Sequence, residues 1–307
     1  MTNATIKDAV KSHWVQRLPP SWLPYAQLMR LERPIGWWLL LLPCWWGVSL
    51  AQLTFPGGGI PNLYHMALFF IGAVAMRGAG CVVNDLVDQD IDVKVERTRN
   101  RPLPSGRVSR KQAIIFLTAL LLIGLIVLLQ FNRLTIATAT TSLLIVAVYP
   151  FMKRVTYVPQ LVLGLAFNWG GLVGWTAETN SITTAPIALY IGGIFWTLAY
   201  DTIYAHQDKD DDALIGVKST ALLLGKSTPS WLMIFFALSL VCIDAAIWLA
   251  HASLIAHIGL AAAALHAMWQ IKNFDDTDAV RCLQLFRANR TFGLFILVGM
   301  LIGCLTK

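Results

Sequence analysis

Long apolar stretches, separated by short polar segments, dominate the pattern of this chain. Nine of them approach the roughly 20 residues that a helix needs to cross about 30 Å of hydrocarbon. The alternation of apolar and polar residues that is typical of an outer-membrane barrel does not occur over strand-length stretches. The pattern therefore predicts an all-α, polytopic membrane protein, with spans at about residues 35–55, 63–84, 112–130, 134–151, 158–176, 185–204, 229–250, 253–271 and 287–305.

Composition agrees with this class. Hydrophobic residues make up 56% of the 307 residues and charged residues 13%, and the mean hydropathy is +0.61, which excludes a soluble globular protein. Residues 1–34 carry charges, several prolines, Trp14 and Trp22, with no apolar core or cleavage site of a signal peptide. We expect residues 1–34 to form a cytoplasmic segment, with a helix at the membrane interface, and residues 35–307 to form one intramembrane domain.

The placement of basic residues predicts the orientation. Of the 24 Lys and Arg, 21 lie before the first span, in the loops that follow the even-numbered spans or, for Arg287 and Arg290, in the first turn of the last span. Cytoplasmic loops carry the excess of Lys and Arg in membrane proteins. The N-terminus and these loops should therefore be cytoplasmic. The net charge of +7 follows from this topology, and the spread of the basic residues over separate loops argues against nucleic acid as a partner.

Ten of the seventeen acidic residues lie in two short stretches, each at the edge of an apolar run. In a helix, residues at i, i+3 and i+7 share one stripe, and both stretches have polar side chains at this spacing. Like charges on one stripe repel, so a row of carboxylates indicates bound divalent cations, with Mg²⁺ the first candidate. We call the two rows the first aspartate motif, Asn84, Asp85, Asp88 and Asp92, and the second aspartate motif, Asp201, Tyr204, Asp208 and Asp212.

A basic loop with Pro and Gly follows each acidic row, at residues 94–107 and 216–220. Carboxylates that hold a metal ion, a metal ion that holds phosphate oxygens and a nearby Arg or Lys together suit a diphosphate. The alternative is that each loop is a solvated segment whose opposite charges satisfy one another. The candidate cations for the diphosphate are Lys94, Arg97, Arg101 and Lys218.

Further polar residues lie within or beside the apolar stretches. Tyr149 and Lys153 share a helical face, Pro150 is expected to end or kink that helix, and Arg154 follows. Taken alone, the Lys153–Arg154 pair also fits a positive-inside anchor. Arg77 lies inside a span, where a charge is expensive and a function or a buried partner is expected.

At this point the motifs resemble a known family. Both aspartate motifs are similar to those of the UbiA-type intramembrane prenyltransferases. Within that superfamily, the strings at residues 33–38, 101–103, 149–154 and 216–220 resemble the 4-hydroxybenzoate polyprenyltransferases of ubiquinone synthesis. The resemblance runs from about residue 28 to residue 225, and the last three spans are similar mainly in hydropathy.

The resemblance implies a bundle of about nine transmembrane helices around a central cavity that opens to the cytoplasmic side. It also implies two Mg²⁺ ions, a polyprenyl diphosphate and the aromatic acceptor 4-hydroxybenzoate. Metal ligands would then be Asp85, Asp88, Asp92, Asp208 and Asp212; diphosphate contacts Asn84, Lys94, Arg97, Arg101, Tyr204 and Lys218; catalytic groups Asp201, Arg154, Lys153 and Tyr149; and acceptor contacts Arg77, Arg33 and Asn168.

Other functions stay open at the level of the sequence. The same chemistry on a naphthoate, homogentisate or haem-type acceptor would use the same motifs, and a phosphate or divalent-cation transporter would also carry intramembrane charges. Against a transporter, the acids lie at one membrane face and no inverted repeat is visible. The N-terminal segment, with Asp8 and no Arg/Ser-rich amphipathic run, favours a bacterial inner membrane over a mitochondrial inner membrane.

Overall fold

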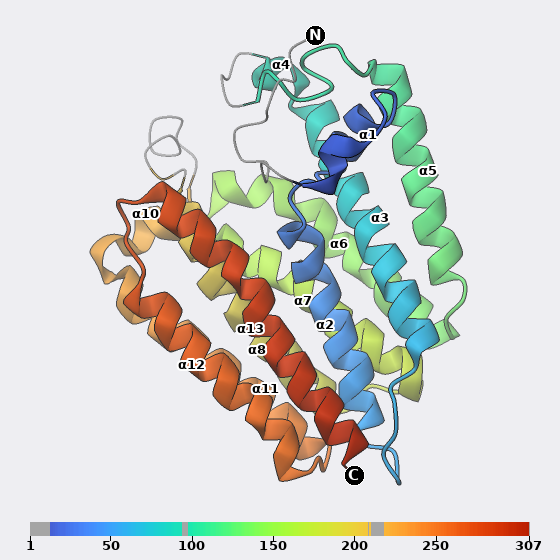
Figure 1. The fold of residues 1–307 in the computed structure, drawn as a ribbon, viewed down its shortest axis with the longest axis vertical. Helices are drawn as coiled ribbons and strands as arrows, with labels where there is room; N and C mark the ends of the chain where they lie inside the picture. Colours follow the sequence, from blue (N-terminus) through green and yellow to red (C-terminus); the bar gives the residue numbers. More distant parts are fainter. Residues whose placement is uncertain (1–12, 94–97, 208, 210–217, 307) are drawn as a thin grey trace. The chain divides into compact units, whose positions relative to one another are not determined.

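The structure is a computed structural model, and it describes residues 13–93, 98–207, 209 and 218–306 (Figure 1). Within these ranges every regular element is a helix, as the apolar pattern predicts. The contacts divide the chain into two compact units, which are treated separately below. Unit 1 comprises residues 1–38 and 68–130, and unit 2 comprises residues 39–67 and 131–307. The prediction of one domain over residues 35–307 is not tested by this division.

The helices follow the predicted spans closely. In chain order they are η1 (Trp14–Arg17), α1 (Leu23–Leu28), α2 (Ile35–Gln52), α3 (Leu63–Val87), α4 (Gln89–Asp92), α5 (Arg110–Leu128), α6 (Arg133–Val155), α7 (Pro159–Thr179), α8 (Thr184–Ala205), α10 (Thr220–Leu224), η2 (Gly225–Ser227), α11 (Thr228–Leu249), η3 (Leu254–His257), α12 (Ile258–Lys272) and α13 (Ala279–Leu305).

Each of the nine predicted spans coincides with a long helix of the described chain. By length and composition, six helical stretches are apolar enough to cross a membrane: Ile35–Gln52, Leu63–Val87, Arg110–Leu128, Thr220–Leu249, Leu254–Lys272 and Ala279–Leu305. Arg133–Tyr149 of α6 is a shorter apolar helix, and α7 and α8 also fall outside this set. The all-α, polytopic membrane fold is confirmed, and the count of nine spans stays a prediction.

Local sequence explains where several helices begin and end. Ser109 and Gln112 form a reciprocal capping box that starts α5, and the Asn132 side chain caps α6. Helix α7 ends at Thr179, and the capping residue Asn180 adopts the left-handed conformation with φ 49°. Of the two predicted effects of Pro150, an end to the helix is wrong, because α6 continues to Val155, and a kink stays a prediction. One missing N–H removes a single helical hydrogen bond, and the preceding apolar turns keep the helix intact.

Unit 1 is built around α3 and α5, which run side by side (Figure 1). Small residues of α3, Ala75 and Ala79, pack in one apolar cluster with Ala113 and Leu120 of α5. Leu28 of α1 is fully buried in the same cluster. This packing fixes α1 and the segment after it against the end of α3, where the first aspartate motif begins.

Unit 2 contains α6 to α13 and most of α2. Helix α8 packs against both α7 and α11, and α12 packs against α13. Glycines allow α2 and α7 to approach closely: a Cβ on Gly47 would lie 2.2 Å from the Gly171 carbonyl oxygen, and a Cβ on Gly174 would lie 2.2 Å from that of Cys44. Small residues at helix crossings are typical of membrane bundles, in which dispersion replaces the hydrophobic effect between helices.

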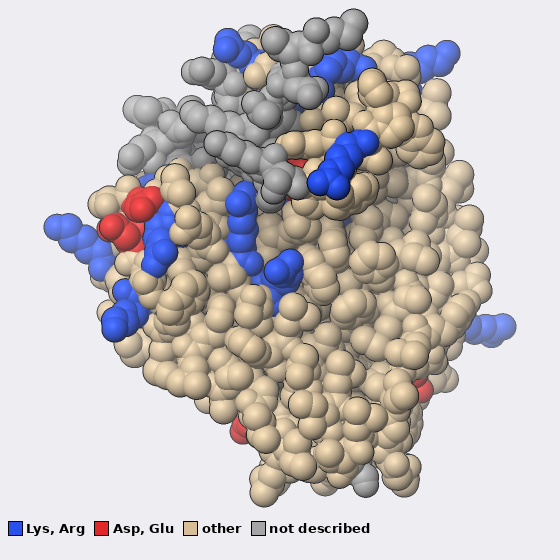
Figure 2. Space-filling model, viewed as in Figure 1, with Lys and Arg blue, Asp and Glu red and all other residues tan. Residues whose placement is uncertain are grey.

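Large apolar side chains are exposed along the long helices. On α5 they include Ile115, Leu122 and Ile126, which are 60%, 53% and 60% exposed. Figure 2 shows that most of the visible face carries neither acidic nor basic side chains. Exposed apolar surface on this scale marks contact with a membrane or a partner, and the hydropathy of the helices identifies the membrane.

Candidate functional site

The first aspartate motif lies where α3 ends. Helix α3 stops at Val87, Asp88 connects it to the short α4, and backbone bonds from Asp88 to Asn84 and from Asp92 to Asp88 keep the helical register across the break. The predicted stripe is therefore present, but burial differs along it. Asp85 is fully buried, Asp92 is 6% exposed, Asp88 is half-buried, and Asn84 is exposed.

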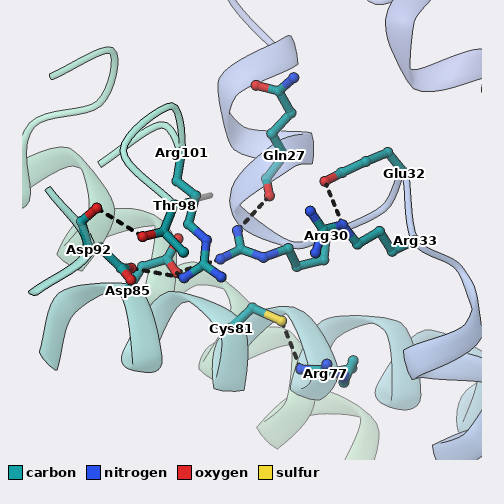
Figure 3. Close-up of polar contacts among 10 residues, drawn as sticks. All are labelled: Gln27, Arg30, Glu32, Arg33, Arg77, Cys81, Asp85, Asp92, Thr98 and Arg101. Carbon is teal, nitrogen blue, oxygen red and sulfur yellow. Dashed lines mark hydrogen bonds and ion pairs between the residues drawn. The ribbon is translucent and has the colours of Figure 1, made fainter. Parts of the chain in front are cut away.

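Two arginines converge on the buried acids (Figure 3). Arg30 Nη2 lies 2.5 Å from Asp85 Oδ1. Arg101 Nη1 lies 3.4 Å from the same oxygen and 2.8 Å from Asp92 Oδ2. We call these four residues the acid–arginine cluster. Its two carboxylates and two guanidinium groups balance in charge, which explains how two acids tolerate burial at neighbouring positions.

Backbone geometry holds both arginines in place. Arg30 follows α1 in the left-handed conformation, with φ 58°, and its Nη1 donates to the Gln27 carbonyl at 3.0 Å. On the loop that carries Arg101, the Thr98 hydroxyl donates to the Asp92 carbonyl at 2.8 Å. Asp85 keeps the pKa of Arg30 above its usual range, although burial acts in the opposite direction.

The cluster provides oxygen donors that suit a hard divalent cation. Among the described residues, no three acidic, histidine or cysteine side chains stand close enough together to hold a metal ion in the present arrangement. Asp85 Oδ2 is buried and receives no hydrogen bond from the described part of the chain. Carboxylate oxygens at a helix end, with a basic loop beside them, are the donor set that Mg²⁺ and a phosphorylated ligand require. The residues therefore fit the predicted metal.

Arg77 lies further along α3 in unit 1, on the stripe of the aspartates. Its Nη1 contacts Cys81 Sγ at 2.8 Å (Figure 3). A Cβ on Gly36 would lie 2.7 Å from Arg77 Nε, so the absence of a side chain at the start of α2 makes room for the guanidinium group. The described structure thus gives this intramembrane arginine neighbours but no carboxylate partner.

The segment before α2 holds a buried acid that the sequence did not point to. Glu32 is 2% exposed, and neither of its carboxylate oxygens receives a hydrogen bond from a described residue. Arg33 Nε lies 3.9 Å from Glu32 Oε1. Burial raises the pKa of Glu32 above its usual range, and the nearby arginines only partly oppose this shift. The predicted acceptor contact Arg33 is thus engaged with its own neighbour.

The second aspartate motif begins on the last turns of α8 in unit 2. Asp201 is half-buried. The Tyr204 ring packs on Phe286 of α13 at a centroid distance of 4.5 Å. Asp208 and Asp212 lie outside the described residues. This part of the metal prediction therefore rests on the sequence alone.

Lys218, at the end of the second basic loop that the structure describes, meets the end of α6 within unit 2. Lys218 Nζ donates to the carbonyl of Val155, the last residue of α6, at 3.2 Å and lies 5.2 Å from the Tyr157 ring centroid. Arg154, one residue earlier, is exposed. Tyr149 lies further back on α6 and is half-buried. The structure thus brings Lys218 next to Arg154, two basic residues that sequence reasoning had placed in separate roles.

Asn168 is at the centre of a buried polar group in unit 2. It is 1% exposed, and its Nδ2 donates to the Gly164 carbonyl and to the Thr197 hydroxyl at 2.7 Å. The Thr197 hydroxyl in turn donates to the Tyr200 hydroxyl at 3.1 Å. Asn168 therefore has a structural role between α7 and α8 in addition to its predicted contact with the acceptor.

Some predicted site residues are beyond what the structure describes, and others were missed. Lys94 and Arg97 lie outside the described ranges, as does the side chain of Lys153. Sequence reasoning missed Arg30 and Glu32. Arg30 sits three residues before Arg33 at the edge of the first span, which is the one signal that would have pointed to it.

The fold and the acid–arginine cluster together define a membrane-embedded helical protein with a candidate site for a divalent cation and a phosphorylated ligand. The chain belongs to the UbiA prenyltransferase family, whose model matches residues 40–298. This membership agrees with the resemblance in the aspartate motifs and leaves the transporter alternative without support.

Individual relatives agree with the family. A protein of Drosophila melanogaster named 4-hydroxybenzoate polyprenyltransferase, mitochondrial, is 46% identical over 308 residues, which cover 100% of this chain and 78% of that protein. The apo structure of a UbiA homolog from Aeropyrum pernix K1 is similar with a TM-score of 0.69 and 25% identity, over 86% of this chain and 97% of that one. A UbiA homolog from Archaeoglobus fulgidus, solved with GPP and Mg²⁺, is similar in fold, with a TM-score of 0.59 and 18% identity, over 90% of this chain and 99% of that one.

Proposed function

We propose that this protein transfers a polyprenyl group from polyprenyl diphosphate to the ring carbon ortho to the hydroxyl of 4-hydroxybenzoate. The product is 3-polyprenyl-4-hydroxybenzoate, an intermediate of ubiquinone biosynthesis. The observation that carries the proposal is the 46% identity, over the whole chain, to a protein named for this activity. The acid–arginine cluster supports it, because it supplies the charges that a diphosphate site needs.

The two aspartate motifs are proposed to hold Mg²⁺, with two ions as the family resemblance implies. The metal-bound homolog from Archaeoglobus supports divalent metal use. When bound, the metal would stabilise negative charge on the departing diphosphate. The proposed ligands in the first motif are Asp85, Asp88 and Asp92, and those in the second are Asp208 and Asp212. Asn84 and Tyr204 are proposed to contact the diphosphate beside them.

The chain's own groups must make ionisation of the allylic C–O bond feasible. Cationic side chains act when they stabilise the departing diphosphate more strongly than the ground-state ester. Lys94, Arg97, Arg101 and Lys218 are the proposed cations. Burial among helices keeps the allylic cation away from water, and exit toward lipid gives the polyprenyl tail an apolar environment.

The acceptor needs a cation for its carboxylate and a base for the ring proton. Arg154 and Lys153, with Arg77, Arg33 and Asn168 as further contacts, are proposed to bind the acceptor. Asp201 and Tyr149 are proposed to orient the phenol, and Asp201 to take a proton. Its half-buried position on the last turns of α8 supports this role, because a partly buried carboxylate is less solvated than a surface one.

Replacing Arg154 with alanine should raise KM for 4-hydroxybenzoate by about tenfold and leave KM for the diphosphate within a factor of two. The reason is that an exposed guanidinium that pairs with a carboxylate contributes about 1.5 kcal/mol or more through a charge-assisted bond. Steady-state kinetics with each substrate varied in turn measures this. Arg133→Ala, at the other end of α6, is the matched control. Equal effects on both KM values would indicate that Arg154 contacts the diphosphate and not the acceptor.

Replacing Gly36 with valine should raise KM for the acceptor through Arg77. The new Cβ would displace the guanidinium group, whose Nε lies 2.7 Å from that position. Gly80→Val is the matched control on α3, because no described atom lies within 4 Å of a Cβ there. We expect at least a fivefold rise for Gly36→Val and less than a twofold change for Gly80→Val. Unchanged kinetics in Gly36→Val would remove Arg77 from the acceptor site.

The cellular membrane is a separate part of the proposal. The bacterial inner membrane that residues 1–34 favoured finds no support in the name of the Drosophila relative, which is mitochondrial. We therefore propose the alternative, the mitochondrial inner membrane. The predicted orientation, with the N-terminus and the basic loops on one side, applies to either membrane.

A panel of acceptors tests the function directly. Membranes that contain the protein receive polyprenyl diphosphate and radiolabelled 4-hydroxybenzoate, with Mg²⁺ or with EDTA, and the lipid-soluble label is counted. Label that depends on Mg²⁺ supports the proposal. If only labelled naphthoate or homogentisate gives a lipid-soluble product, prenyl transfer stands and the proposed acceptor is wrong. If no acceptor gives a product, the proposal of a prenyltransferase is refuted.

A further inference from the structure

The acid–arginine cluster has a shared cation at its centre. One nitrogen, Arg101 Nη1, contacts Asp92 Oδ2 at 2.8 Å and Asp85 Oδ1 at 3.4 Å. Asp85 also has Arg30 as a second partner at 2.5 Å, whereas the described structure pairs Asp92 with Arg101 alone. Without Arg101, Asp85 would still have Arg30 as a counter-charge, whereas Asp92 would have none from the described residues.

The two arginines differ in how firmly they are held. Arg30 bonds both the buried Asp85 and the carbonyl of Gln27, and only 12% of its side chain is exposed. Arg101 comes from a loop and is 20% exposed. A loop arginine whose only described partners are carboxylates can reorient at little cost, whereas movement of Arg30 would leave a fully buried acid without its counter-charge.

A divalent cation on Asp92 would compete with this guanidinium group. Arg101 already neutralises the carboxylate, and two cations on the same oxygen atoms repel strongly at short range. A diphosphate removes the conflict, because it offers Arg101 new anionic acceptors in a bidentate geometry. Metal and diphosphate would then bind cooperatively, because each ligand favours the position of Arg101 that the other ligand requires.

We propose that Arg101 is an exchangeable counter-cation: it holds the place of the metal on Asp92, and passes to the phosphate oxygens when metal and diphosphate bind together. Asp85 pairs with Arg30 and Arg101 through Oδ1, and its buried Oδ2, which receives no hydrogen bond from the described residues, is left for the metal. The inference rests on the proposed function, and it predicts that the acid row binds metal ions more weakly without the diphosphate than with it.

Mn²⁺ binding to the full-length protein in lipid nanodiscs tests the exchange without turnover. Electron paramagnetic resonance counts free Mn²⁺, with no diphosphate present. We expect Arg101→Gln to bind Mn²⁺ at least tenfold more tightly than the wild type, and Arg101→Lys, which keeps a cation, to stay within threefold. Arg99→Gln, an exposed position on the same loop, is the charge-matched control and should change affinity less than twofold.

The second measurement is the binding affinity for tritiated geranyl diphosphate at saturating Mn²⁺, without an aromatic acceptor. Arg101→Gln should bind geranyl diphosphate at least tenfold more weakly than the wild type. The same substitution therefore raises the affinity for Mn²⁺ alone and lowers the affinity for the diphosphate. In the wild type, geranyl diphosphate should tighten Mn²⁺ at least tenfold, a measurement that does not depend on the folding of any variant. A merely structural role for Arg101 would weaken both ligands together.

The outcomes separate the two proposals. If Mn²⁺ binds to the wild type with geranyl diphosphate, but Arg101→Gln does not tighten Mn²⁺ alone, the exchange is wrong and the metal site stands. The same conclusion follows if the wild type shows no coupling between the two ligands. If no Mn²⁺ binds even with geranyl diphosphate, the metal site of the proposed function fails, and the exchange fails with it.

Discussion

Replacing Asp88 with alanine abolishes prenyl transfer while the protein still folds. Asp88 lies between α3 and α4 at the centre of the first aspartate motif, and it is half-buried. No described residue forms an ion pair with its carboxylate, so its removal leaves no buried charge without a partner. Its contribution is therefore expected in the metal-bound transition state, where loss of one stabilising group costs about 100-fold or more in kcat.

Radiochemical turnover and thermal unfolding of the purified variant measure the two parts of this prediction. Asp90→Ala is the matched control, because Asp90 belongs to the same short α4 but is exposed and lies off the stripe. Asp90→Ala should keep at least half of the wild-type activity. Turnover by Asp88→Ala at close to the wild-type rate would refute the metal assignment of the first motif.

Replacing Asp85 with alanine destabilises the fold by about 3 kcal/mol, because Arg30 is left buried without its counter-charge. The pair is short, at 2.5 Å, and the Asp85 side chain has no exposed surface, so solvent screens it little. The estimate is at the lower end of the range for broken buried pairs, because Arg30 keeps its bond to the Gln27 carbonyl at 3.0 Å.

Thermal unfolding in nanodiscs, followed by circular dichroism, tests this second prediction. Asp88→Ala, one turn away on the same stripe, should unfold within a few degrees of the wild type. The double variant Asp85→Ala with Arg30→Met should recover part of the loss, because the unpaired charge is gone. Equal stability of Asp85→Ala and the wild type would mean that the cluster contributes nothing to the fold.

The fold was predictable because the thickness of the bilayer sets the length of each apolar stretch. The bilayer requires about 20 apolar residues for each span, and nine stretches of this kind became nine long helices. The limits of α6 were less predictable. Proline commonly ends helices in water-soluble proteins. Helix α6 nevertheless continues past Pro150 to Val155, because apolar surroundings favour internal hydrogen bonds.

The site was predictable only in part, for a physical reason. Helical spacing shows which side chains share a stripe, and the stripe of Asp85, Asp88 and Asp92 emerged as expected. It does not show which distant residues pack against that stripe. Arg30 is 55 residues away from Asp85 in the chain, and only the packing of α1 on α3 and α5 brings it there. The argument from repulsion within the row considered only the row itself, and Arg30 and Arg101 come from other segments of the chain.

Basic residues show the same limit. Lys218 was predicted as a diphosphate contact from its loop, and the structure places it on the carbonyl end of α6, beside Arg154. A lysine at a helix C-terminus is stabilised by the helix dipole, a local effect that the sequence of the loop does not reveal. Its proposed role in catalysis requires it to leave or share this position.

The most direct test of the account is the chemical structure of the product that the purified protein makes in nanodiscs. Polyprenyl diphosphate, ring-labelled 4-hydroxybenzoate and Mg²⁺ are incubated together, and the lipid-soluble product is examined by mass spectrometry and NMR. The account predicts a new carbon–carbon bond ortho to the hydroxyl, with the phenol and the carboxylate both free, and no product with EDTA. An ester or ether of the acceptor, or polyprenol alone, would contradict it.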